Sequence, residues 1–97
     1  MTDIAPPPTY PHDPDAVLDY KWKWASWLPA GDTIASVDVT KAEGDTVEID
    51  DVEHDGTEVV AWVSGGTADT FVQLTARITT TQGRVDDRTM QLYVQHR

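Results

Sequence analysis

The chain has no cysteine and few basic residues: its 97 residues include 7 Lys and Arg against 17 Asp and Glu, a formal net charge of −10. Without cysteine, a disulfide framework and thiolate metal sites are excluded. There is no run of 18 apolar residues, and no basic segment precedes an apolar stretch at the N-terminus. The sequence therefore predicts neither a transmembrane helix nor a secretory signal. The scarcity of basic side chains argues against nucleic-acid binding, which needs a basic surface against phosphate.

The acidic residues are concentrated in the first part of the chain. Residues 1–60 hold 14 acidic and 3 basic side chains, whereas residues 61–97 hold 3 acidic and 4 basic ones. One interpretation is solubility, with the acids on solvated turns and outer strand faces. The other is a surface that meets a positively charged partner, or repels like-charged copies, in an assembly.

Five of the six prolines lie near the N-terminus. Proline lacks a backbone N–H and fixes φ, so residues 1–16 are predicted to form an extended arm without a ladder of its own. A chain of this kind becomes ordered only where it lies on a neighbour. The segment 7–10 also matches a short pattern that WW domains bind, but such matches are common by chance. The five prolines are Pro6, Pro7, Pro8, Pro11 and Pro14.

From Val17 onward, apolar and polar residues alternate with a period of two, which is typical of half-buried strands. Six or seven such segments, spaced by turns, predict an all-β fold: an Ig-like antiparallel β-sandwich of about seven strands over residues 17–97. Trp22 or Trp24, together with Trp62, is expected to fill the core between the sheets. The alternating apolar positions include Leu18, Tyr20, Trp22, Trp24, Ala35, Val37, Val39, Val47, Ile49, Val72, Leu74, Ala76, Ile78, Met90, Leu92 and Val94.

No pattern in the sequence predicts a catalytic or metal site. The segment Asp51–Gly56 resembles the start of a calcium loop, but Trp62 stands where the closing Glu would be, and a solvated acidic turn is the better interpretation. His12, His54 and His96 are predicted to be separate surface residues rather than zinc ligands. No serine lies in a nucleophile elbow, so we expect no enzyme and no cofactor.

Four large aromatic residues occur within eight positions, from Tyr20 to Trp27. They have two interpretations: packing in the core of the first strand, or exposed anchors for a partner, because Trp and Tyr dominate interface hot spots. The cluster and the arm together give the predicted partner-binding residues, namely Pro6, Pro7, Pro8, Tyr10, Pro11, Trp22, Trp24 and Trp27.

Two stretches of the chain resemble a known group of proteins. The first is residues 13–20 with 24–34, which contains Asp19-Tyr20, Trp24, Trp27-Leu28 and Gly31-Asp32-Thr33-Ile34. The second is residues 64–68 with 74–84 and 86–90, which contains Arg77-Ile78-Thr79-Thr80, Gly83-Arg84 and Asp86-Asp87-Arg88. Together they resemble small, acidic, Ig-like proteins from the structural modules of tailed bacteriophages, described as fiber–tail adaptors or minor virion proteins. The resemblance implies a virion component without catalytic residues.

The function expected from these observations is that of a non-enzymatic structural protein of a phage particle, assembled in the cytoplasm of the bacterial host. It would dock in multiple copies onto capsid, portal, neck or tail subunits through its arm and aromatic cluster. No metal, nucleic acid or membrane partner is expected. The alternatives are a capsid decoration protein, or a carbohydrate- or host-binding module in which Trp22, Trp24 or Trp27 stacks on sugar rings.

Overall fold

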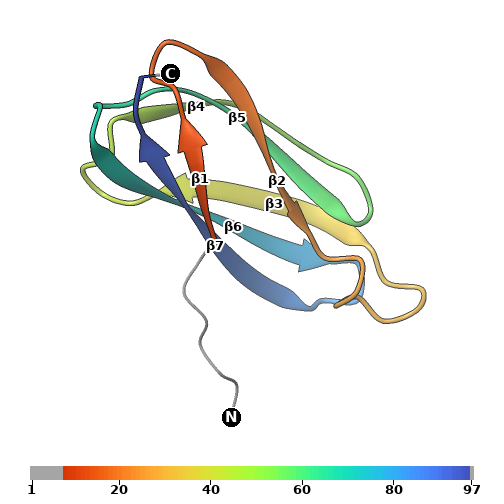
Figure 1. Ribbon diagram of the computed structural model, residues 1–97. Helices are drawn as coiled ribbons and strands as arrows, with labels where there is room; N and C mark the ends of the chain where they lie inside the picture. The colour runs from red at the N-terminus through yellow and green to blue at the C-terminus, as the bar shows by residue number, and fades with distance from the viewer. Residues whose placement is uncertain (1–7, 97) are drawn as a thin grey trace.

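The computed structural model describes residues 8–96, which form two layers of β-structure (Figure 1). The predicted all-β sandwich of about seven strands is confirmed. No helix long and apolar enough to cross a membrane is found among the described residues. The strands are β1 (Thr9–His12), β2 (Val17–Lys23), β3 (Ile34–Lys41), β4 (Val47–His54), β5 (Glu58–Gly65), β6 (Thr70–Thr80) and β7 (Val85–Val94).

The strands form a four-stranded sheet in the order β1-β7-β6-β3 and a three-stranded sheet in the order β2-β5-β4. All pairings are antiparallel except that of β1 with β7, which is parallel. Immunoglobulin domains also place their second, fifth and fourth strands in one sheet and their third, sixth and seventh in the other. Here the first strand lies beside the seventh. The Ig-like character stays a prediction.

The end of the predicted arm belongs to the sandwich. Thr9–His12 pairs with β7, and the backbone N–H groups of Gln91 and Gln95 donate to the carbonyl oxygens of Pro8 (2.8 Å) and His12 (2.9 Å). The prediction that residues 1–16 have no ladder is therefore wrong for this stretch. An edge strand bonds on one side only, so it tolerates Pro11. The predicted contacts of Pro6 and Pro7 lie outside the described residues.

The core follows the predicted alternation except at Leu18, Ala35 and Trp62. Leu18 and Ala35 are exposed, and the register shift between Ile34 and Ser36 places Ile34 in the core instead of Ala35. Trp22, Trp24 and the inward positions of β5, β6 and β7 are buried between the sheets. Trp62, expected in the core, lies on the opposite side of β5 and is only half-buried, because Val59, Ala61 and Val63 occupy the inward positions. The segment from Val59 to Val63 is apolar on both sides, so its sequence does not define the inner one.

Candidate interaction surfaces

The predicted partner-binding aromatics divide into a buried pair and an exposed pair. Trp22 and Trp24 keep only 5% and 0% of their surface accessible, whereas Tyr10 and Trp27 keep 42% and 37%. Trp24 donates its indole N–H to an Asp86 carboxylate oxygen (2.8 Å), and the Arg88 guanidinium lies 4.9 Å from the centre of its ring. The prediction that Trp22 and Trp24 contact a partner is corrected by this burial: both rings are parts of the core.

Trp27 lies in the connection between β2 and β3, where the chain turns back at one end of the sandwich. The backbone N–H groups of Trp27 and Leu28 donate to the Trp24 carbonyl oxygen at 2.9 and 3.0 Å. The Leu28 side chain packs against the core, which leaves the Trp27 ring at the surface. The turn thus presents one large apolar ring on a backbone that is tied to buried Trp24.

Asp32 fixes the far side of this connection, a role that the sequence did not predict. Its Oδ1 accepts hydrogen bonds from the backbone N–H groups of Thr33 (3.0 Å) and Gln82 (3.2 Å) and from the Thr81 hydroxyl (3.0 Å). Burial alone would raise the pKa of Asp32, but hydrogen bonds from these residues and from the Thr80 side chain hold it below the usual range. Asp32 therefore ties the Trp27 connection to the β6–β7 turn as a carboxylate.

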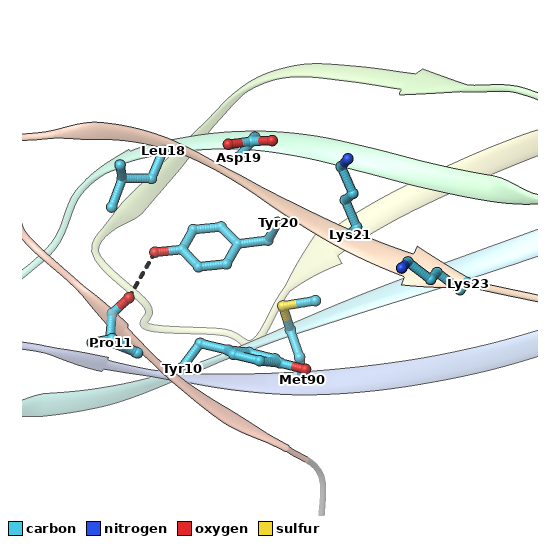
Figure 2. A pocket seen from close by; sticks show the side chains of 8 residues that line it. All are labelled: Tyr10, Pro11, Leu18, Asp19, Tyr20, Lys21, Lys23 and Met90. Carbon is cyan, nitrogen blue, oxygen red and sulfur yellow. Dashed lines mark hydrogen bonds between the residues drawn. The ribbon is translucent and has the colours of Figure 1, made fainter.

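A groove of about 480 Å³ runs between the edge strands β1 and β2 (Figure 2). The rings of Tyr10 and Tyr20 lie 6.5 Å apart beside it, and the Tyr20 hydroxyl donates to the Pro11 carbonyl oxygen (2.9 Å). The groove combines aromatic and charged side chains, contributed by Tyr10, Pro11, Leu18, Asp19, Tyr20, Lys21, Lys23 and Met90.

His12 lies behind this groove and is fully buried, so the prediction of a surface position is wrong for this histidine. Its Nδ1 is 2.8 Å from the Tyr20 hydroxyl and its Nε2 is 3.1 Å from the Gly65 carbonyl oxygen. Desolvation lowers the pKa of His12, and the Gly65 hydrogen bond and nearby Asp13 only partly oppose this. The His12 ring thus connects β1 to β2 and β5 of the other sheet.

The opposite end of the sandwich carries an exposed aromatic pair that sequence analysis missed. Phe71, with 58% of its surface accessible, stacks at 4.8 Å on Tyr93 of the neighbouring strand. The sequence pattern could have revealed this exposed ring, because Phe71 has the opposite parity to the inward residues Val72 and Leu74. Its aromatic ring therefore lies on the outer face of the four-stranded sheet.

Asp13, Asp15 and His96 could in principle hold a metal ion, since one ligand atom from each lies within 4.8 Å of the others. The His96 Nδ1 is 3.3 Å from an Asp15 oxygen, and both side chains are well exposed. Exposed groups of this kind are common without a metal. The geometry alone therefore assigns them no cofactor.

Most of the acidic segment Asp51–Gly56 belongs to a strand, because Asp51–His54 are the last residues of β4 and pair with β5. The prediction of a solvated acidic turn is therefore wrong for these four residues, and only Asp55 and Gly56 lie in the β4–β5 turn. An Asp55 carboxylate oxygen accepts hydrogen bonds from the backbone N–H groups of Thr57 and Glu58, both at 2.8 Å. These bonds hold the pKa of Asp55 below its usual range. The carboxylate satisfies the backbone of the β4–β5 turn.

The fold and these surfaces define a small structural domain whose exposed aromatic and charged side chains are suited to contacts with other proteins. Residues 12–93 match the family described as podophage GP4 fiber-tail adaptor protein gp77, and the chain belongs to this family. It is therefore a small structural protein associated with a bacteriophage tail, and the predicted virion class is confirmed. No curated protein matches the chain.

Proposed function

We propose that this protein is an adaptor that joins fibers to the tail of a podophage-type particle. The observation that carries the proposal is the family match, which extends over residues 12–93 and so includes nearly the whole sandwich. An adaptor has to contact two different partners. The chain offers separate surfaces for this: Trp27 at one end of the sandwich, and Tyr10 with Pro11 beside the groove at its side.

Trp27 would act as the anchor on one partner. A half-exposed tryptophan on a well-fixed turn can bury its ring against another chain without the cost of ordering a loop. The hydrogen bonds of the turn to Trp24 and of Asp32 to the β6–β7 turn supply that order before binding.

Tyr10 and the prolines would contact the other partner. Tyr10 and Pro11 are both exposed residues of β1, and the segment before them is the predicted arm. An extended arm adds contact area without needing a core of its own. Because several copies would attach to one particle, each single contact can be weak and the attachment as a whole still stable. The acidic excess of residues 1–60 would orient the domain against a basic surface.

The adaptor proposal is tested with particles assembled in the absence of this protein. We expect tails that lack fibers, seen by negative-stain microscopy, and restored fibers when the wild-type chain is supplied in trans. Normal fibers on particles without the protein would contradict the proposal. A capsid decoration role predicts a different result, namely fibered particles with weakened shells.

The arm is tested separately by deleting residues 1–7, which leaves β1 and its ladder with β7 intact. We expect fewer copies per particle, measured by quantitative mass spectrometry, while the thermal unfolding midpoint of the isolated domain stays unchanged. If this variant is incorporated in as many copies as the wild type, residues 1–7 do not contribute to partner binding.

A sugar-binding role loses two of its three predicted platforms, because Trp22 and Trp24 are buried. Trp27 remains exposed. A soluble fiber or tail partner that protects Trp27 fluorescence from quenching would favour the adaptor, whereas protection by oligosaccharide would favour the sugar-binding module.

A further inference from the structure

Three of the four edge strands among the described residues carry a feature that hinders the addition of another strand. β1 contains Pro11, which lacks a backbone N–H. β3 has a register shift between Ile34 and Ser36, and β4 has one between Ile49 and Asp51. Proline and bulges at sheet edges are common means of preventing edge-to-edge pairing.

The fourth edge strand, β2, differs from these three. It pairs with β5 in seven consecutive pairs, from Val17 with Ser64 to Lys23 with Glu58, without a register shift and without proline. As an edge strand in regular geometry, it directs backbone N–H and C=O groups away from β5. β2 is thus the edge on which a further strand fits with the least distortion.

The groove described above opens along this edge. Leu18 and Tyr20 have the inward parity of β2, and Asp19 and Lys21 have the outward parity, yet all four line the groove. Neighbouring residues of a strand point to opposite faces, so a hollow lined by both kinds lies at the edge rather than over one face. In Figure 2 these side chains follow β2, with Tyr10 and Pro11 opposite.

The charge of β2 suits a second copy of this chain. Lys21 and Lys23 are two of the three basic residues in residues 1–60, and Arg88 lies beside Lys23. The Arg88 guanidinium donates to the Lys23 carbonyl oxygen at 2.6 Å, so at this end of β2 the carbonyl is already bonded and the added ladder is centred away from it. Two molecules that each carry a net charge of −10 repel, and they repel least where basic side chains gather.

We propose that two copies of this protein pair through β2, antiparallel and related by a two-fold axis that passes near Tyr20. In that register Asp19 of each copy lies opposite Lys21 of the other, which makes two ion pairs on the outer face of the joined sheet. Centring the axis on Asp19 or on Lys21 would instead bring like charges face to face. The pairing also covers exposed Val17 and Leu18. Two-fold dimers are the commonest symmetric assemblies.

The pairing is tested on the purified full-length chain by sedimentation velocity over a concentration series. At 0.15 M salt, where charges beyond ~8 Å are largely screened, we expect the mass to rise with concentration from monomer to dimer. Lys21→Glu should lower the association constant by about tenfold or more, since it replaces two attractions by two repulsions. The double variant Asp19→Lys with Lys21→Glu should restore it, because the charges are exchanged but remain complementary across the axis.

Arg77→Glu is the control, because it changes the net charge as Lys21→Glu does, but on the outer face of the other sheet. It removes an exposed ion pair with Asp87 (3.3 Å) and should leave the association constant unchanged within about threefold. A chain that stays monomeric at all concentrations would overturn the proposal, and so would a double variant that associates no better than Lys21→Glu.

Cross-linking gives a second, independent test of the register. The chain has no cysteine, so Asp19→Cys and Lys21→Cys each introduce a single thiol. Residues opposite each other on antiparallel strands have Cβ atoms about 4.5–5.5 Å apart, close enough for a disulfide after a small adjustment. We expect rapid disulfide formation in a mixture of the two variants and much less in either alone. Equal cross-linking in all three samples would overturn the register.

Discussion

Trp22 in β2 and Trp24 just after it differ in burial from Trp27 in the loop that follows, although only four residues lie between Trp22 and Trp27. Trp22 and Trp24 share the inward parity and are enclosed by both sheets, whereas Trp27 follows a turn and stays at the surface. The comparison shows that one aromatic-rich segment can supply both buried core rings and an exposed ring. The change from buried to exposed rings coincides with the end of the regular alternation.

The largest effect on stability is expected for the buried residue Trp24. Trp24→Ala removes a fully buried indole, its hydrogen bond to Asp86 and its contact with Arg88, and should cost about 3–5 kcal/mol of unfolding free energy. Urea unfolding followed by circular dichroism measures this. Trp24→Phe, which keeps a ring, should fold and lose less. A loss below about 1 kcal/mol for Trp24→Ala would mean that this ring is not a core element.

The next effect concerns the anchorage of the Trp27 connection. Asp32→Ala leaves the N–H groups of Thr33 and Gln82 and the Thr81 hydroxyl without their acceptor, and should lower the melting temperature and speed hydrogen exchange in residues 27–33. Asp38→Ala, an exposed Asp on β3, is the matched control. Equal exchange in both variants would contradict this role.

Asp32 also predicts a pH dependence. Its pKa in the folded state lies below the unfolded value of 3.8, so its contribution to stability is present above pH 3.8 and is lost as the pH falls through the folded pKa. Asp32→Asn should therefore show a shallower loss of stability than the wild type below pH 4. Parallel curves for the two proteins would contradict the assignment.

His12 predicts a smaller effect in a different pH range. Its folded pKa lies below 6.5, so the unfolded chain binds more protons between the two values, and stability rises with pH up to about 6.5. His12→Gln should flatten this rise in melting temperature, while His54→Gln, at an exposed position, should leave it unchanged. An unaltered slope in His12→Gln would show that another group titrates there.

The smallest effect on stability is expected at Trp27. Trp27→Ala should cost about 1 kcal/mol or less, because much of the ring is already in water. The corresponding shift of the melting temperature is about 4–8 °C or less for a domain of this size. If Trp27→Ala lost as much unfolding free energy as Trp24→Ala, Trp27 would also be a core residue, which would contradict the account.

The inward or outward position of a residue was predicted well where it depends on the alternation within its own strand. The alternation of apolar and polar residues in β6 and β7 identified the inward faces of these two strands. These features depend on period-two patterning, which the sequence displays directly.

Residues whose surroundings are distant in the sequence were not predicted. β1 exists because β7, about 80 residues away, offers it an edge, and the burial of His12 depends on Tyr20 and Gly65. The inner side of β5 could not be chosen because both of its sides are apolar. The hydrogen bonds of Asp32 were not predicted, since its partners Thr81 and Gln82 lie far from it in the sequence.

The central claim is that Trp27 binds another virion protein whereas the buried tryptophans only stabilise the fold. The most direct test is to count, by quantitative mass spectrometry, the copies of the Trp27→Ala variant that are incorporated into particles. Phe71→Ala is the control, because Phe71 is at least as exposed as Trp27 and lies at the other end of the sandwich. We expect the Trp27 variant to be folded but depleted from particles by about tenfold or more, as is usual for a hot-spot aromatic, and the Phe71 variant to be incorporated normally. Wild-type incorporation of folded Trp27→Ala would contradict the account.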